Sequence, residues 1–260
     1  MTGSDFNSPA IRSMFNGFFL LSEEAWLNEG KKVPKKKRNT DLYSECPANE
    51  SYVAGELRDG LVVLDFDDEE QGKFIVSLLH LIVDKQMIGD IDLKYNVVKT
   101  EHGYHIYFKN PDLVENPKGH VAKRIPPGNV AALGVECEYK IGADFQKNGD
   151  YEPLKLGDNR REFIGEVYSF DELSDLPFFL YHFKKRESIF KMKEGSRNVV
   201  LSEFALGLQK IMEPEDVDTT CRIINGMVFT DKLPKSEVDT ILRPETFQKT
   251  LPKGNKPDKL

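Results

Sequence analysis

The most informative pattern is a run of four apolar residues that ends abruptly in acids, Leu61 to Glu70 (LVVLDFDDEE). The branched residues at its centre and the turn signal Asp59-Gly60 before it favour a buried β-strand over a helix. Because side chains alternate between the two faces of a strand, Asp65 and Asp67 are expected on one face and Phe66 on the other. The pattern predicts a strand that carries two carboxylates to a sheet edge.

A second strand pair is predicted further along the chain. Leu93 to Thr100 and Tyr104 to Phe108 flank a Glu-His-Gly turn, so the two segments are expected to form a hairpin. Within the second segment, His105 and Tyr107 fall on one face, and the apolar and aromatic residues between and beside them fall on the other. One face of this hairpin is therefore polar and carries a histidine.

Acids also occupy one face of a third segment, Leu133 to Ile141. There Glu136, Glu138 and Lys140 alternate with apolar residues, which predicts a strand with one charged face. A further strand is predicted over Tyr151 to Leu156. Polar faces that carry carboxylates thus recur on separate strands.

Apolar residues recur with helical spacing in other segments, and the pattern changes after Leu176. We expect a mixed α/β domain over residues 1–176, a small all-helical domain over residues 188–247, and a disordered tail or linker over residues 248–260. Helices are predicted over Ser8–Asn28, Gln71–Gln86, Asn198–Ile211, Pro214–Val228 and Ser236–Leu242.

The composition of the 260-residue chain is typical of soluble globular proteins, with 39% hydrophobic and 30% charged residues. No apolar run reaches the roughly 20 residues that a membrane helix needs, so we expect an intracellular, cytoplasmic protein with no membrane partner. The three cysteines are widely spaced, a pattern that argues against a disulfide framework and against a zinc site.

Positive charge is clustered although the net charge is −7. The run Lys31 to Arg38 contains Lys35, Lys36, Lys37 and Arg38 beside a proline. Such a run is typical of a solvated loop, of an arm that contacts phosphates, or of a basic nuclear import signal. The last interpretation makes a nuclear location an alternative to the cytoplasm.

Carboxylates at neighbouring positions repel one another unless a cation lies between them. Mg²⁺ and Mn²⁺ prefer oxygen ligands and leave positions open for substrate phosphates. Asp65, Asp67 and either Glu136 or Glu138 are therefore candidate ligands, since a two-metal phosphoryl-transfer site needs shared and flanking oxygens. His105 is a candidate phosphate contact or proton carrier, and a structural hydrogen bond is its alternative role.

Four motifs, in this order, resemble the primase-polymerase (prim-pol) branch of the archaeo-eukaryotic primase superfamily, which is found in plasmids, phages and other mobile elements. The first motif is the apolar strand that ends in Asp65-Phe-Asp67, and the second is Thr100-Glu-His-Gly103-Tyr-His105. The third is Glu138-Tyr-Lys140-Ile-Gly142. The fourth, Glu194-Gly-Ser-Arg197-Asn198 with the helices after it, is similar to the primase C-terminal helical module. The match extends over residues 50–245.

The resemblance implies a DNA primase and DNA-directed polymerase, a nucleotidyltransferase that makes and extends primers on single-stranded DNA in viral or mobile-element DNA replication. The implied fold is α+β (α/β), with a curved, mostly antiparallel catalytic sheet of the RNA-recognition type, flanking helices, and then the helical domain. Residues 1–176 would form the prim-pol catalytic domain. Two Mg²⁺ or Mn²⁺ ions and nucleoside triphosphates are implied, with a replicative helicase as a partner in cis or in trans.

The resemblance also implies roles for individual residues. The catalytic residues would be Asp65, Asp67, Glu138 and His105, of which the three acids bind metal and Glu136 is the alternative in register. Nucleotide binding would use His105, Lys140, Lys99, Thr100, Gly103 and Arg160. Contacts to the DNA template would come from Lys35, Lys36, Lys37, Arg38, Lys123, Arg124, Arg197 and Asn198.

The chain departs from the family pattern at two points. It has Glu where the third carboxylate is usually Asp, and Glu101-His102 replaces the usual small-residue turn. Three alternatives follow: a phosphatase of the haloacid dehalogenase type, disfavoured because Asp68 stands where Thr or Val is usual; another metal-dependent nucleotidyltransferase or nuclease; and a catalytically degenerate replication initiator that only binds single-stranded DNA. Arg197 and Asn198 could also serve only as a helix cap.

Overall fold

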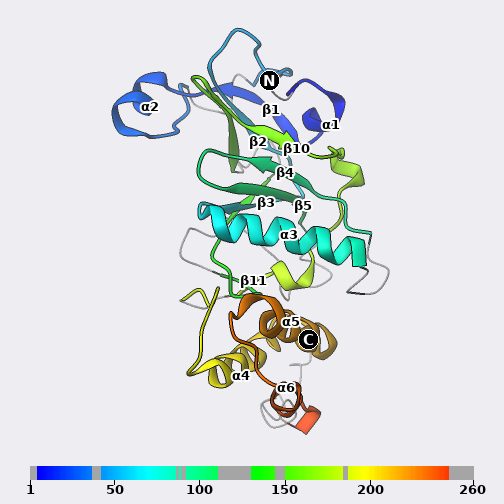
Figure 1. Cartoon of the computed structure of the whole chain (residues 1–260). Helices are drawn as coiled ribbons and strands as arrows, with labels where there is room; N and C mark the ends of the chain where they lie inside the picture. The colour runs from blue at the N-terminus through cyan, green and yellow to red at the C-terminus, as the bar shows by residue number, and fades with distance from the viewer. Residues whose placement is uncertain are drawn as a thin grey trace, which may run out of the picture.

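The structure of the chain is a computed structural model that describes residues 5–36, 42–85, 88, 92–110, 130–143, 150–183 and 187–245. It is a mixed α+β fold whose paired strands are all antiparallel in the described parts, as expected from the sequence. The chain forms three layers, with a central sheet between an N-terminal sheet and a set of helices (Figure 1).

The central sheet carries the charged strands predicted from the sequence. Its five strands lie in the order β10-β4-β5-β3-β7. In the chain, β3 leads into helix α3 (Glu69–Lys85), which crosses one face of the sheet before the β4–β5 hairpin (Figure 1). The strand bounds are β3 Leu61–Phe66, β4 Asn96–Lys99, β5 Tyr104–Lys109, β7 Glu138–Ile141 and β10 Glu162–Ile164.

A second sheet covers the opposite face of the central sheet. Its four strands lie in the order β1-β2-β8-β9. Their bounds are β1 Phe15–Leu20, β2 Tyr52–Leu57, β8 Tyr151–Leu156 and β9 Asn159–Arg160, and short helices α1 (Pro9–Arg12) and α2 (Glu23–Glu29) flank β1. A two-stranded sheet of β6 (Val130–Ala131) and β11 (His182–Phe183) lies beside the helices.

Two hydrophobic cores follow from the alternation of side chains in the central sheet. Val63 and Tyr107 face the N-terminal sheet and share a core with Leu57 of β2. Leu64 and Ile106 face the other way and share a core with the apolar stripe of α3, which contains Ile75, Leu78, Leu79 and Ile82. Tight packing on both faces explains why every residue of β3 is buried.

The C-terminal part is helical. It contains α4 (Arg197–Leu208), α5 (Pro214–Ile223), a π-helical turn over Ile224–Val228, and α6 (Lys235–Ile241), preceded by 3₁₀ turns at Phe170–Glu172 and Phe178–Leu180. Phe204 of α4 belongs to the same hydrophobic core as Leu133 and the α3 stripe. The division into domains at residues 176 and 188 stays a prediction, and the predicted tail, residues 248–260, lies outside the described residues.

Most predicted elements are confirmed. The helices predicted over Gln71–Gln86, Asn198–Ile211, Pro214–Val228 and Ser236–Leu242 correspond to α3, α4, α5 with its π-helical turn, and α6. The Leu93–Thr100 and Tyr104–Phe108 hairpin is formed by β4 and β5, and Tyr151–Leu156 is β8.

The helix predicted over Ser8–Asn28 is wrong. Its central part is β1, which pairs with β2, and only short helices lie on either side. Phe15 and Phe18 enter one core and Phe19 enters another, so both faces of the strand are apolar. Apolar residues on both faces of a strand imitate helical spacing in the sequence.

The strand predicted over Leu133–Ile141 is shorter than expected. Residues 132–135 form a turn in which the Gly134 amide donates to the Ala131 carbonyl, and Gly134 has a φ of 74°, a left-handed conformation that favours glycine. The regular strand β7 therefore begins only at Glu138. Glu136 lies before it, in an isolated bridge to Val130.

In the described ranges, no helix is long and apolar enough to cross a membrane.

Candidate active site

Four of the predicted site residues lie side by side on the central sheet. Asp65 of β3 pairs with His105 of β5 on one side and with Glu138 of β7 on the other. Directly opposed residues of antiparallel strands point to the same face, so the three side chains form a row. Lys140 lies two residues beyond Glu138, on the same face.

The chain brings these side chains together through close backbone contacts at two glycines. A Cβ atom on Gly103 would lie 1.7 Å from the Phe66 carbonyl oxygen, and one on Gly142 would lie 1.7 Å from the Arg58 carbonyl oxygen. A side chain at either position would push the β4–β5 turn or the end of β7 away from β3. Both motif glycines therefore have a structural reason to be glycine.

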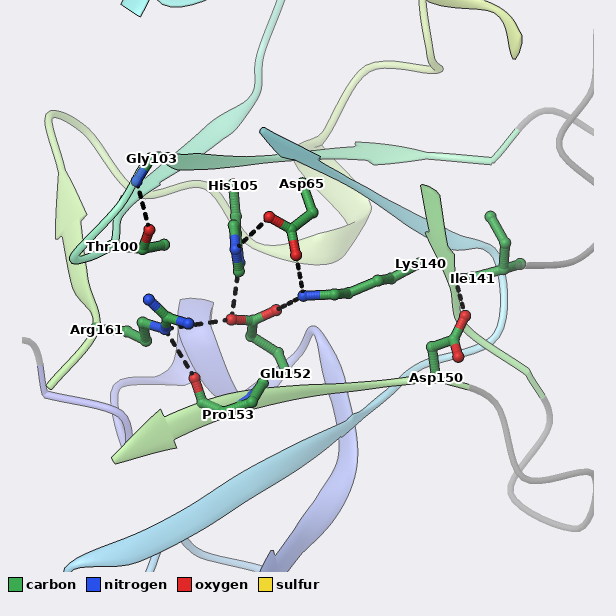
Figure 2. A network of polar contacts seen from close by, with 10 residues as sticks. All are labelled: Asp65, Thr100, Gly103, His105, Lys140, Ile141, Asp150, Glu152, Pro153 and Arg161. Atoms are coloured by element: carbon green, nitrogen blue, oxygen red, sulfur yellow. Dashed lines mark hydrogen bonds and ion pairs between the residues drawn. The ribbon is translucent and has the colours of Figure 1, made fainter. Parts of the chain in front are cut away.

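A buried network of charges joins this row to the N-terminal sheet (Figure 2). Lys140 Nζ lies 2.6 Å from Asp65 Oδ2 and 3.2 Å from Glu152 Oε2, so it bridges two carboxylates from different sheets. Arg161 Nε lies 3.6 Å from Glu152 Oε1. Glu152 is fully buried in β8, and these cations offset the free energy that burial of its charge would otherwise cost.

His105 lies between the same two carboxylates. Its Nε2 atom is 2.9 Å from Asp65 Oδ1, and its Nδ1 atom is 2.8 Å from Glu152 Oε1. His105 thus contacts one carboxylate oxygen from each of the two sheets.

The pKa values of the network follow from burial and mutual attraction. Burial raises the pKa of Asp65, but attraction to His105 and Lys140 outweighs burial and holds it well below its usual range. Burial opposes ionisation of Glu152 in the same way, and attraction to His105 and Lys140 lowers its pKa to about 2. Burial alone would lower the pKa of Lys140, whereas Glu152 and Asp65 raise it above its usual value.

The row opens onto solvent at the end of β3. Asp67 is exposed immediately after the strand, and it lines two adjoining hollows together with Asp65 and Glu138. Lys32 and Lys140 line one hollow, and Glu136 lines the other. The site thus has three carboxylates at its centre and two lysines on one wall.

Lys32 enters the site from the loop after α2. Its backbone carbonyl accepts a hydrogen bond from the Tyr151 hydroxyl, which ties the loop to β8. The residue as a whole is exposed, but its charged end is partly buried at the rim of the hollow. That burial lowers the pKa of Lys32, and repulsion from Arg161 and Lys140 lowers it further.

Comparison with known proteins adds no family to this geometry. No family model, no curated protein and no solved structure matched the chain.

The carboxylates are of the chemical type that a divalent cation prefers. Asp65, Asp67 and Glu138 line one hollow, and Asp65 Oδ1 is a buried oxygen without an aligned hydrogen-bond donor. Within the described ranges, no three His, Cys, Asp or Glu side chains are already grouped to hold a metal ion. The two Asp65 oxygens instead lie against Lys140 and His105, which a metal ion would have to displace.

Of the two glutamates left open by the sequence, Glu138 has the better placement. It is buried, opposes Asp65 directly, and lines both hollows. Glu136 is exposed and lines only one of them, and its amide donates to the Gln71 side chain. The metal role of either residue stays a prediction.

Three residues predicted to bind nucleotide make local structural contacts. Thr100 Oγ1 accepts a hydrogen bond of 2.9 Å from the Gly103 amide, which closes the β4–β5 turn (Figure 2). Lys99 Nζ lies 2.7 Å from Glu69 of α3 and over the ring of Tyr104. Arg160 belongs to β9, but its side chain lies outside the described part. Their nucleotide-binding roles stay predictions.

The predicted DNA contacts are dispersed. Lys35 and Lys36 are exposed in the loop after α2, whereas Lys37, Arg38, Lys123 and Arg124 lie outside the described residues. Arg197 donates to the Asp231 carbonyl oxygen, and the Asn198 side chain accepts from the Val199 amide, so both support the start of α4. Ser196 is the N-cap residue of α4, so neither of them is the cap itself, and a DNA role stays a prediction.

Glu152 and Arg161 were not predicted as site residues, and Lys32 was predicted only as part of the basic run Lys31 to Arg38. The sequence did contain a signal for Glu152, because it lies two residues before Leu154, the spacing of side chains on one face of a strand. A charged residue in line with a buried leucine needs partners of opposite charge. The partners themselves come from strands far away in the sequence, so only the fold reveals them.

Proposed function

We propose that this chain is a metal-dependent nucleotidyltransferase of the prim-pol type, which makes or extends primers on single-stranded DNA. One observation carries the proposal: Asp65, Asp67 and Glu138 line the same hollow as Lys32 and Lys140. Carboxylates can hold divalent cations, and neighbouring lysines can hold the phosphates of a nucleotide. The hollow therefore offers negative charge for the metal ions and positive charge for the phosphates of a metal-bound triphosphate.

In this proposal Asp65, Asp67 and Glu138 would hold two Mg²⁺ or Mn²⁺ ions. When bound, these ions would favour deprotonation of the attacking hydroxyl and neutralise charge on the leaving pyrophosphate. The protein's own residues would bind and orient the nucleotide. Lys140 and Lys32 supply positive charge on one wall, and His105 is held rigidly beside Asp65.

The strand order supports the same proposal. Within the order β4-β5-β3-β7, the strand that comes first in the chain, β3, lies between β5 and the edge strand β7, and α3 follows β3 in the chain. An RNA-recognition-type sheet would also place its first strand inside the sheet. This order sets Asp65 of β3 directly beside Glu138 of β7.

The test is nucleotide incorporation by the full chain with a matched pair of variants. Asp67→Asn and Asp59→Asn both neutralise an exposed aspartate beside β3, but Asp67 lines the hollow and Asp59 lies at the opposite end, where it accepts from the Gly60 amide. Wild type and Asp59→Asn should incorporate labelled nucleotides into new strands on a single-stranded DNA template with Mn²⁺ or Mg²⁺. Asp67→Asn should lose at least about 100-fold in rate, equivalent to about 2.7 kcal/mol.

A second function is favoured by a separate observation. Because Asp65 is held by Lys140 and His105 at both oxygens, the site could also be the remnant of a catalytic centre in a module that only binds single-stranded DNA. Salt-sensitive DNA binding without incorporation, unchanged in Asp67→Asn, would select this function. Shortening of labelled DNA instead of extension would select a nuclease.

A further inference from the structure

We propose that Glu152 is a positioning residue, which holds Lys140 on the wall of the hollow and His105 behind that wall when a metal ion binds Asp65. This inference rests on the proposed function, because it concerns the metal and nucleotide of that same site. Glu152 does not belong to the central sheet. It reaches the site from β8 of the opposite sheet (Figure 2).

His105 and Lys140 share two partners. His105 and Lys140 each contact two carboxylates, Asp65 and Glu152, at distances between 2.6 and 3.2 Å. Asp65 lines the hollow, whereas Glu152 is fully buried behind it. Of the two carboxylates, only Asp65 can therefore be reached by a cation that enters from solvent.

A divalent cation on Asp65 would compete with both of its present partners. Like charges repel, so Lys140 Nζ would be driven from Asp65 Oδ2, and the cation would compete with His105 Nε2 for Asp65 Oδ1. Without a second anchor, these side chains would lose their fixed positions. Glu152 supplies that anchor, since its Oε1 faces His105 Nδ1 and its Oε2 faces Lys140 Nζ.

Arg161 keeps Glu152 itself in position. Its Nε atom lies 3.6 Å from Glu152 Oε1 and donates at 3.3 Å to the Pro153 carbonyl oxygen, so the guanidinium is fixed to the same strand. The consequence is an order of events: metal binding at Asp65 frees Lys140 Nζ, which lines the hollow, to face a polyphosphate, while Glu152 retains both Lys140 and His105. Glu152 touches no substrate in this scheme.

The first test compares Glu152→Gln with Glu152→Asp and wild type in two binding measurements. Mn²⁺ affinity is measured by electron paramagnetic resonance, and affinity for a non-hydrolysable nucleoside triphosphate is measured by calorimetry with Mn²⁺ present. For Glu152→Gln we expect Mn²⁺ affinity within about twofold of wild type and nucleotide affinity at least about tenfold weaker. Glu152→Asp, which keeps the charge, should recover part of the nucleotide affinity.

A second measurement observes the wild-type protein and uses a variant only to assign its resonances. The ¹⁵N resonances of the His105 ring are followed as Mg²⁺ is added, and a His105→Asn variant assigns them among the five histidines. We expect the Nε2 resonance to shift on metal binding and the Nδ1 resonance to stay in place. A shift at both nitrogens, or at Nδ1 alone, would overturn the inference.

The outcomes separate this inference from the proposed function. Glu152→Gln could lose Mn²⁺ affinity and nucleotide affinity equally, in proportion to its lost stability. That result would show that Glu152 has only a structural role. Metal-dependent nucleotide binding that needs Glu152, in a protein that incorporates no nucleotide, would support the positioning role and reject the polymerase. Absence of metal-dependent nucleotide binding in the wild type would overturn both.

Discussion

Lys140 Nζ lies 2.6 Å from Asp65 Oδ2, so a buried cation occupies the carboxylate that stands between His105 and Glu138. The contact joins two adjacent strands of the central sheet, and the same ammonium group reaches Glu152 of the other sheet. A lysine in this position does two things. It neutralises carboxylates that would otherwise repel one another, and it competes with any metal ion for Asp65.

Substitution Lys140→Met should destabilise the fold by about 3–5 kcal/mol, because it leaves Asp65 and Glu152 buried with less compensating charge. Lys155→Met is the matched control. Lys155 is an equally buried lysine, but its ammonium donates to the carbonyl oxygens of Pro47 and Ala48. Its loss should cost less, about 1–3 kcal/mol. Urea denaturation measures both values.

Magnesium should distinguish the two lysine variants. In Lys140→Met an Asp65 oxygen is no longer held by the ammonium group, so Mg²⁺ should restore more stability to this variant than to Lys155→Met or wild type. Equal effects of Mg²⁺ on all three proteins would argue against a metal site at Asp65.

Acid should weaken the fold through Glu152. Its pKa is lowered to about 2 in the folded protein, whereas an unfolded glutamate titrates near about 4.3. The folded state thus binds fewer protons, so the stabilisation is present in full above the unfolded pKa and is lost as the pH falls toward 2. The full contribution is about 3 kcal/mol. Unfolding curves between pH 7 and pH 3 should show a steeper loss in wild type than in Glu152→Gln, and parallel slopes would contradict the assignment.

Gly103→Ala should cost about 3 kcal/mol or more, because its Cβ would overlap the Phe66 carbonyl oxygen of β3. Gly226→Ala is the control, since a Cβ at Gly226 meets no atom within 4 Å, and its effect should stay within about 1 kcal/mol. Thermal unfolding of the two variants gives the comparison. A Gly103→Ala variant as stable as wild type would show that the β4–β5 turn can move away from β3.

Lys32→Ala should weaken binding of a nucleoside triphosphate about tenfold, or about 1.4 kcal/mol, if the hollow holds phosphates as proposed. Lys31→Ala is the control in the same loop, because Lys31 pairs with Glu29 on the protein surface. That variant should bind nucleotide as wild type does, since exposed ion pairs contribute little. Affinities are measured by calorimetry at fixed salt. Equal affinities of the two variants would show that Lys32 does not bind the nucleotide.

The sequence by itself determined which side chains share a face. Strand alternation is local, with a period of two residues, so Asp65, His105, Glu138 and Lys140 could be placed on polar faces without knowledge of the fold. Helix α3 was predictable for the same reason, because one stripe of its surface is apolar and the other is not.

Only the tertiary structure decided which faces meet. Strand β1 is apolar on both sides, so its spacing did not distinguish it from a helix until its pairing with β2 was known. Glu152 lies in a strand of the other sheet, and its contacts with His105 and Lys140 depend on how the two sheets pack. Charge pairing across sheets is set by long-range packing, and no local periodicity in the chain encodes it.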